Sequence, residues 1–462
     1  MDSPEDPYIA PLASGELEIN RVDLGKVGLK MEEMVPLDLS DEPRKPSRLR
    51  LFKCPVIGLK MLLLAEMSVV LFFNFASFSI LATFFPNVAL DRGADRTQIG
   101  LIFGAYPAIA FPASLVYGAL IPLIGTEKLL LAGIFTNGIT VVLFGFVPLA
   151  TSARLFISMC FLLRVLAAIG GAACETTVRA IVLTEFSDNV GFSMGLLSTS
   201  TQLGFTVGPF LGGILYSLGG FMLPFAVIGG LLLALLFLVC YALPKQTADP
   251  SNLEKGPMTQ ALTIPGVLLM GMAINVNIIG LAFLDPTLAP HVFSIDPSMA
   301  TAIVGLIFLI SGLSAAALSP VVGTLCDKKG CFSESVIFGL VICGISLLLV
   351  GPSPAFNLFL PSAIWLVCIA NVLNGASTAF VIAPSVSVMS DHVSAAGMPD
   401  DIATNGAVSG IVTAALNCGS FLGAFGGGVL NDWLSFSTAA TVVAVLQFLQ
   451  AVSIWLFNFF WR

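Results

Sequence analysis

The sequence predicts an all-α integral membrane protein, with twelve transmembrane helices arranged as two six-helix bundles. The first observation is composition: 56% of the 462 residues are hydrophobic and only 10% are charged, against about 25% charged in a soluble domain. The second is a series of apolar runs of about 20 residues, the length that crosses a bilayer as a helix. The third is an internal repeat. A chain this apolar cannot bury its surface by folding in water, so it belongs in a membrane.

The apolar runs define twelve predicted spans. They are 61–86, 98–122, 128–150, 154–178, 192–216, 221–243, 262–288, 299–323, 333–352, 360–385, 405–430 and 437–460. All should be helices, because an open sheet edge cannot satisfy its backbone groups in lipid. Lys and Arg concentrate on one side of the spans, which predicts that both termini are cytosolic. That side carries Arg44, Lys45, Arg48, Arg50, Lys53, Lys128, Lys245, Lys255, Lys328, Lys329 and Arg462, and the other carries Arg92, Arg96 and Arg154.

Polarity divides the chain into four parts. Residues 1–60 are polar and Pro-rich, and we expect a disordered cytosolic tail there. Residues 61–243 should form the first bundle and residues 262–460 the second. The segment 244–261 contains the most polar stretch after the tail, and we expect it to be a cytosolic linker between the bundles.

The two halves repeat each other at matching spans. GLIF occurs at Gly100–Phe103 in span 2 and again at Gly305–Phe308 in span 8. Span 5 reads GFTVGPFLGG and span 11 reads GSFLGAFGGG, with four glycines in register. Span 1 contains LATFFPNVA where span 7 contains LAFLDPTLA. Two parallel repeats are a transporter architecture, with the substrate held between them near the middle of the membrane.

Span 5 carries the strongest motif, a set of glycines around a proline: Gly204, Gly208, Pro209, Gly212 and Gly213. Glycines four residues apart lie on one helix face and allow another backbone to approach closely. Pro209 removes one backbone hydrogen bond and permits a bend. The motif therefore fits a helix that rocks during transport, and static close packing is the alternative.

Span 4 contains an arginine, Arg164, within FLLRVLAAIGG. An arginine without a partner costs at least a few kcal/mol at the centre of a bilayer. Arg164 should therefore face an interior cavity, where it helps to move protons, or act as an anchor that binds backbone carbonyls.

The turn after span 8 reads GTLCDKKG, from Gly323 to Gly330. Asp327, Lys328 and Lys329 can pair with neighbouring helix ends and latch the cytosolic face. In the matching turn of the first half, Pro122 takes the place of the acid. The alternative for both turns is ordinary cytosolic positive charge.

These patterns, in this order on twelve spans, resemble the major facilitator superfamily. The span 5 motif is similar to its antiporter motif, and Arg164 matches the span 4 arginine of its proton-coupled members. Within it, GLIFGAYPAIAFPASLVYG, FISMCFLLRV and AFLDPTLAP resemble the vesicular amine transporter family, with the greatest similarity to its polyamine branch. The resemblance covers nearly all of residues 60–460. It implies a vesicular exporter that exchanges cytosolic organic amines for lumenal protons.

The chain departs from that family at most of its intramembrane acids. The monoamine members carry acids where this chain has Asn74, Ala379 and Thr413, and the polyamine branch carries acids near Ala110, Ala167 and Val388. Asp285 survives from that set, and Phe85 stands at the matching position of the first half. We expect Asp285 to be the group that binds a proton and a cationic substrate in turn. The alternative is a solvated helix end.

Other polar residues in the spans are candidates for the substrate site. Asn275, Asn277, Asn371, Asn374 and Asn417 could line a cavity or make hydrogen bonds between helices. Asn74 and Tyr106 could contribute hydrogen bonds or a cation–π surface. Glu175 and Arg179 lie four residues apart and can pair on one helix face.

Several chemistries are not expected. Nine scattered cysteines and two histidines form no metal or disulfide pattern. Gly191, Ser193 and Gly195 have the spacing of a hydrolase nucleophile but open a membrane helix, so we expect no catalytic residue. Phosphate-binding glycine loops are not found, which favours an ion gradient over ATP as the energy source. No cofactor and no nucleic acid partner is expected.

The expected function is therefore proton-coupled antiport of an organic amine by alternating access, in an intracellular vesicle membrane or alternatively the plasma membrane. The lipid bilayer, protons and the small-molecule substrate are the expected partners of a monomer. Two alternatives remain open. One is a facilitator or symporter of a neutral or anionic metabolite, and the other is a non-transporting sensor or scaffold built on a transporter fold.

Overall fold

The computed structural model describes residues 53–242, 256–299, 301–351 and 363–461. Residues 55–462 form one compact unit. Of the predicted tail and the predicted linker, the greater part lies outside the described residues. The described part is helical throughout, as the composition predicts.

The first half contains six long helices and one short one. They are α1 (Lys53–Ser79), α2 (Phe85–Asp91), α3 (Arg96–Ile124), α4 (Thr126–Phe144), α5 (Ala153–Glu185), α6 (Val190–Gly219) and α7 (Met222–Ala242). Local signals start and stop them. Asp95 and Gln98 form a capping box before α3, with Gln98 N donating to Asp95 Oδ1 over 2.7 Å. Gly125, with φ of +85°, makes the turn between α3 and α4.

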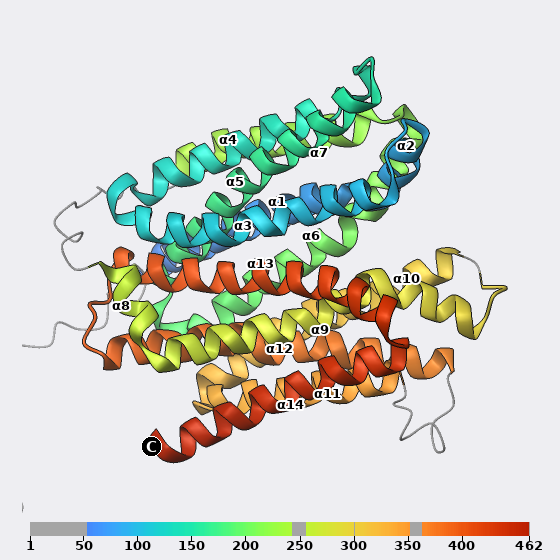
Figure 1. The fold of residues 1–462 in the computed structure, drawn as a ribbon. Coiled ribbons are helices and arrows are strands. Elements are labelled where there is room, and N and C mark those ends of the chain that lie inside the picture. The colour runs from blue at the N-terminus through green and yellow to red at the C-terminus, as the bar shows by residue number, and fades with distance from the viewer. Residues whose placement is uncertain (1–52, 243–255, 300, 352–362, 462) are drawn as a thin grey trace, which may run out of the picture. The chain divides into compact units, whose positions relative to one another are not determined.

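The second half repeats this pattern after a short helix, α8. Its helices are α8 (Pro257–Thr263), α9 (Pro265–Ile295), α10 (Thr301–Lys329), α11 (Phe332–Val350), α12 (Ile364–Ala395), α13 (Ile402–Trp433) and α14 (Phe436–Trp461). We call the face at which α1 begins and α14 ends the terminal face. In Figure 1 it lies on the left, where α8 is found, and α2 lies towards the opposite face.

Eleven of the long helices are long and apolar enough to cross a membrane. The long helix outside that set is α6, whose middle turns are rich in Ser, Thr, Gln and Gly. Twelve helices of at least 19 residues nevertheless match the twelve predicted spans in order. Crossing by α6 and a cytosolic position for the termini stay predictions.

The largest differences from the predicted spans lie at helix ends. The first span was expected to run to residue 86, but α1 ends at Ser79 and α2 begins a new helix at Phe85. The seventh was expected to end at residue 288, but α9 continues to Ile295 through two prolines. α12 continues ten residues past its predicted end. Hydropathy marks the lipid-crossing part of a helix, and these ends are polar or irregular.

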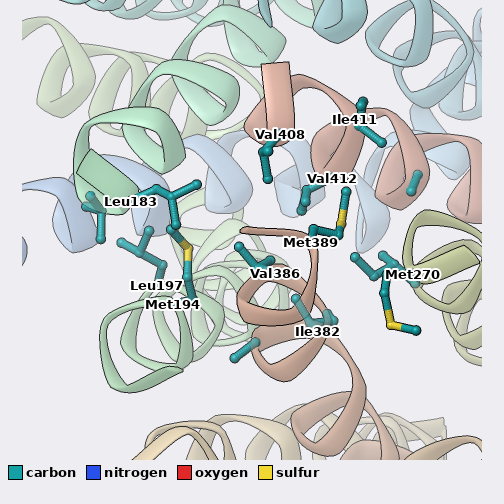
Figure 2. Packing of buried hydrophobic residues seen from close by; sticks show 14 of the residues in the cluster. Leu183, Met194, Leu197, Met270, Ile382, Val386, Met389, Val408, Ile411 and Val412 are labelled. Atoms are coloured by element: carbon teal, nitrogen blue, oxygen red, sulfur yellow. The ribbon is translucent and has the colours of Figure 1, made fainter. Parts of the chain in front are cut away.

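The core of the terminal half joins both halves of the chain. One buried cluster combines side chains of α5 and α6 with side chains of α9, α12 and α13. Figure 2 shows Met194 and Leu197 of α6 lying across from Val386 of α12, with Val408 and Val412 of α13 beyond. Apolar packing therefore closes the molecule near the terminal face.

Glycines on α6 and α13 bring helices into backbone contact. A Cβ at Gly204 would lie 3.0 Å from the carbonyl carbon of Phe72 on α1, and one at Gly419 would lie 2.6 Å from the Asn275 carbonyl oxygen on α9. Nearer the terminal face, a Cβ at Gly118 of α3 would lie 2.9 Å from the Cα of Gly410 on α13. Through glycines, α13 thus packs on α9 of its own half and on α3 of the other half. In the same way, α6 packs on α1 of its own half and on α10 of the other half.

Candidate functional site

Asp285 lies well inside α9. It precedes the last residue of α9 by ten positions, about 15 Å at 1.5 Å per residue. Its side chain is exposed. Asp285 is therefore not at the last turn of the helix, and its role in binding stays a prediction.

The face of α9 that carries Asp285 points between α12 and α13. Asn277 of α9 bonds Ser377 of α12 on one side, and Ile278 packs on Gly419 of α13 on the other. The Asp285 direction falls between these two and continues the line of Ile274, which belongs to the core shared by both halves. Asp285 therefore lies on the face of α9 between α12 and α13, further along the helix than Ile274 and Ile278 of the shared core.

No Lys, Arg or His within the described residues makes a salt bridge with Asp285. Pro286, the next residue, has no N–H and so leaves the Ala282 carbonyl without its helical donor. A carboxylate and a free carbonyl on neighbouring turns are acceptors that suit an ammonium group, which has three N–H donors.

The first half contains a buried polar cluster. Asn137 of α4 donates through Nδ2 to Asn74 Oδ1 of α1 over 2.8 Å, and to Ser77 Oγ over 3.3 Å. The Tyr106 hydroxyl of α3 and Asn74 Oδ1 both converge on Gly171 of α5, where a side chain would clash with them. Three helices thus bring together Asn74 and Tyr106, as predicted site residues, with Asn137, which the sequence reasoning missed. A lone Asn in an apolar span was the available signal.

Arg164 lies beside this cluster and is only 2% exposed. Its guanidinium donates to the backbone carbonyls of Ile102 and Phe78, each over 3.4 Å. It also lies over the ring of Phe78, with Cζ 5.1 Å from the ring centroid, and over the ring of Tyr106 at 5.4 Å. Carbonyls and ring faces, with no described carboxylate, compensate this cation. A small pocket lined by Asn137, Thr140 and Arg164 adjoins it.

The predicted site asparagines of α9 and α12 make their hydrogen bonds to groups other than Asp285. Asn277 Nδ2 donates to Ser377 Oγ over 3.1 Å, and Asn275 Nδ2 donates to the Ala415 carbonyl over 3.2 Å. Asn371 Nδ2 donates within its own helix to the Val367 carbonyl over 2.9 Å. Both side-chain polar atoms of Asn374 are buried without a partner among the described residues. Asn275 and Asn277 therefore join helices, whereas Asn371 and Asn374 do not.

Glu175 forms the predicted pair with Arg179 and also reaches the other half. Arg179 Nη2 lies 2.8 Å from Glu175 Oε1, and both side chains are buried. Asn417 of α13 donates through Nδ2 to Glu175 Oε2 over 3.4 Å. The second contact depends on how α5 and α13 pack, and no spacing in the sequence reveals it.

Asp327 connects α10 to α6. Its carboxylate accepts from the backbone N–H of Gly191 over 2.9 Å and of Phe192 over 2.7 Å, in the first turn of α6. A carboxylate at a helix N-terminus satisfies free N–H groups and the helix dipole. Gly323 permits this approach, because a Cβ there would lie 3.0 Å from the backbone nitrogen of Phe192. Lys328 and Lys329 are exposed at the end of α10.

The glycines of the span 5 motif pack against α1 and the residues that directly follow it, at the side of α6 away from α10. A Cβ at Gly208 would lie 2.9 Å from the Ala76 carbonyl oxygen, and one at Gly212 would lie 2.6 Å from that of Ile80. Gly213 has only an ordinary contact, 3.5 Å from Thr83 Cγ2. α6 is a continuous helix through Pro209. The Pro209 carbonyl accepts from Thr83 Oγ1 over 2.6 Å.

Comparison with known proteins agrees with this architecture. The family described as Major Facilitator Superfamily matches residues 67–330 and 268–461. The Mus musculus protein named MFS-type transporter SLC18B1 is 36% identical over 384 residues, 82% of each chain. The Homo sapiens protein of that name is 33% identical over 381 residues, again 82% of each.

More distant relatives support a coarser conclusion. The synaptic vesicular amine transporter of Rattus norvegicus is 26% identical over 265 residues, 57% of this chain and 50% of that one. The crystal structure of the human organic anion transporter MFSD10 (TETRAN) aligns with a TM-score of 0.67 at 15% identity, over 86% of this chain and 99% of that one, and supports the fold alone. Taken with the repeated helices and the interior polar groups, these matches show that the chain belongs to the Major Facilitator Superfamily of membrane transporters, which are not enzymes.

Proposed function

We propose that this protein is a proton-coupled antiporter of organic amines. The observation that carries the proposal is Asp285, an accessible carboxylate deep within α9 that has no cationic partner among the described residues. An uncompensated charge is costly inside a membrane. Either a proton or an ammonium group removes that cost, and one carboxylate cannot hold both at once. Alternate binding of the two is the requirement for exchange.

The cross-bundle contacts support alternating access. Hydrogen bonds that join the two halves, such as Asn405 Nδ2 to Thr184 Oγ1 at 3.1 Å and Thr199 Oγ1 to the Ala316 carbonyl at 2.8 Å, lie in the terminal half of the helices. Asp285 lies beyond them. This state would therefore admit solute from the opposite face, and the reverse step would need these contacts to part.

The relatives' names favour amines and vesicles. Synaptic vesicular amine transporters are among the relatives, at 24–26% identity in the examples from rat and human. We infer an intracellular vesicle membrane as the location and the lumen as the side towards which Asp285 is accessible. Arg164, held in the first half, would bias the proton step through its fixed positive charge.

An anionic or neutral solute is the second candidate, and Arg164 is the observation that favours it. No described carboxylate neutralises this arginine. It is nevertheless 2% exposed and already contacts two carbonyls and aromatic ring faces. A solute would have to displace those contacts to reach it, so Asp285 is the better candidate for direct binding.

Uptake into reconstituted vesicles with an acidic interior tests the proposal. Labelled monoamines and polyamines should accumulate, and an ionophore that collapses the pH gradient should abolish accumulation. Asp285→Asn should lower uptake by about 10- to 100-fold, because a hydrogen bond to a charged group contributes about 1.5–3 kcal/mol. Unchanged amine uptake by Asp285→Asn would contradict the assigned role, and accumulation of anions or neutral solutes alone would favour the second candidate.

Asp296→Asn provides the matched control. Asp296 follows α9 directly and lies outside the predicted lipid-crossing segment. Its carboxylate accepts from the Ser298 hydroxyl and backbone N–H, which hold the pKa of Asp296 below its ordinary value. Asp296 therefore stays ionised across the gradient, and replacing it should leave uptake unchanged.

A further inference from the structure

One face of α13 carries polar side chains at every fourth residue along its first half. They are Asn405, Ser409, Thr413 and Asn417. Residues four apart lie on one side of a helix, so these side chains form a single stripe. All four are buried.

The stripe lies against α5 of the other half. At the terminal face, Asn405 Nδ2 donates to Thr184 Oγ1 over 3.1 Å. Near the middle of the membrane, Asn417 Nδ2 donates to Glu175 Oε2 over 3.4 Å. Ser409 and Thr413 lie between these two contacts on the same face. We call this stripe of α13, together with its two partners Thr184 and Glu175 on α5, the polar seam.

Hydrogen bonding within the polar seam is incomplete. Arg179 Nε, beside Glu175 on α5, and Ser409 Oγ and Thr413 Oγ1 on α13 are buried without a partner among the described residues. Each such group costs about 1–3 kcal/mol in a dry interface. The neighbouring contact between α13 and α3 avoids this cost with glycines, Gly118 against Gly406 and Gly410. Adhesion between the halves therefore does not need polar side chains.

The polar seam runs from the terminal face towards the middle of the membrane. It begins three residues into α13, at the terminal face, and its inner end is Asn417, fifteen residues into that helix, about 22 Å along the axis. Glu175, at that inner end, is an acid neutralised here by Arg179 at 2.8 Å. Separation of α5 from α13 would expose a polar-lined path from the terminal face to an acid near mid-membrane.

We propose that the polar seam is the solute path on the terminal face, and that Glu175, Thr413 and Asn417 form a cation-binding subsite at its inner end. The proposal rests on the transport function proposed above and names a second acid for the same cationic solute. Asp285 is accessible in this state, and Glu175 becomes accessible when the halves part. In that state Asn417 no longer bonds Glu175, and an organic ammonium group takes its place beside the carboxylate.

Thiol labelling of the full-length protein tests the path. Ser409→Cys and Thr413→Cys are placed singly in a background whose native cysteines are replaced and whose uptake is retained. Ile411→Cys is the matched control, because Ile411 is buried on the same helix but packs on Gly271 of α9, within its own half, so parting of the halves leaves this contact in place. A membrane-impermeant thiol reagent is applied from the terminal face of oriented vesicles, under each direction of the pH gradient.

Labelling of the two seam cysteines should be about tenfold or more faster than labelling of Ile411→Cys, because the reagent enters only the state in which the halves have parted. Labelling no faster than the control under every gradient, while Asp285→Cys is labelled from the opposite face, would overturn the proposal. This readout does not require that an amine be the substrate, so failure of the proposed function is seen separately, as seam labelling without amine uptake.

The subsite is tested by protection. Spermidine or a monoamine should slow labelling of Thr413→Cys by about tenfold at saturation. Glu175→Gln combined with Arg179→Gln removes both members of the ion pair, which avoids leaving one charge buried alone, and should abolish protection while labelling persists. Protection that survives the double substitution would overturn the assignment of Glu175. If the double variant does not fold, Asn417→Ala replaces it, and retained full protection there counts against the subsite.

Discussion

Arg164 shows at the scale of a single residue how this chain keeps a charge inside its first half. The guanidinium spreads its charge over two carbonyls and the rings of Phe78, Phe103 and Tyr106. Its planar fork can address carbonyls of α1 and α3 simultaneously, whereas a lysine ammonium is a compact point charge on a flexible stem. The charge and its geometry are therefore separable by substitution.

Arg164→Lys should retain the positive charge but lower both thermal stability and proton-driven uptake. We expect uptake to fall by about tenfold, because two charged hydrogen bonds weaken together. Thermal melting monitored by size-exclusion chromatography and uptake into acidic vesicles measure the two effects. Arg154→Lys, at an exposed position near the start of α5, is the control and should change neither. Wild-type behaviour of Arg164→Lys would show that only the charge matters.

Two acidic residues within the long helices, Glu175 and Asp285, differ in whether a basic side chain neutralises them. Glu175 has Arg179 one helical turn away, a pairing that the i, i+4 spacing predicts and the structure shows. Asp285 has no such partner among the described residues. Spacing could identify the first pair because it is local. The surroundings of Asp285 depend on the packing of α9 between α12 and α13, which no local pattern encodes.

At the scale of elements, α6 and α13 each contact two helices through glycines. α6 packs on α1 with its later glycines and on α10 with Gly191 and Gly195. α13 packs on α9 with its later glycines and on α3 with Gly406 and Gly410. The repeat in the sequence predicted the matched glycines, and the structure shows that the two helices play corresponding parts.

Gly204→Ala should destabilise the protein. The three atoms nearest the added methyl all belong to the Phe72 backbone, which cannot rotate away. Overpacking costs about 1–3 kcal/mol, which exceeds the gain of about 1 kcal/mol in helix propensity. Thermal melting in detergent should show a lower midpoint. Gly213→Ala on the same helix meets only Thr83 Cγ2 at 3.5 Å and should melt at or above the wild-type temperature. Equal midpoints for the two variants would contradict this account of the close contact.

Among the described residues, twelve long helices match the predicted spans in order, because lipid requires long apolar helices, and crossing by α6 stays a prediction. Helix ends were less predictable. α5 continues to Glu185 through charged residues, and α12 continues to Ala395. These turns lie where backbone hydrogen bonds and neighbouring helices decide the structure and hydropathy carries no signal.

At the scale of the whole molecule, the two halves are joined by contacts at the terminal face. The terminal face is held by Asn405 to Thr184, by Asp327 to the start of α6, and by the apolar core of Figure 2. The sequence predicted that Asp327 latches onto a neighbouring helix end, and the structure identifies that end as the first turn of α6. Which helix would provide it depends on packing that no local pattern encodes. Alternating access requires these contacts to be reversible.

Cross-linking Thr184→Cys to Asn405→Cys with a short bis-thiol reagent should stop transport, because it joins the two halves at the terminal face. Uptake should recover after reduction. Lys60→Cys with Glu185→Cys is the matched pair at the same face but within the first half, where Lys60 Nζ donates to the Glu185 carbonyl over 2.8 Å. Cross-linking that pair should leave uptake intact. Transport that persists in the fully cross-linked first pair would rule out parting of α5 and α13 during the cycle.

The internal repeat contains two versions of the segment that holds Asp285, and the two versions differ in structure. In the first version the helix stops before Phe85, whose ring is fully buried against Phe144 and Phe156. In the second version α9 runs on, and Asp285 stays accessible. The first segment therefore contributes a buried aromatic side chain to the core, and the second presents an exposed carboxylate. The two halves are therefore no longer interchangeable, and a chain assembled from two second halves would carry a pair of acids and lose the aromatic anchor of the first.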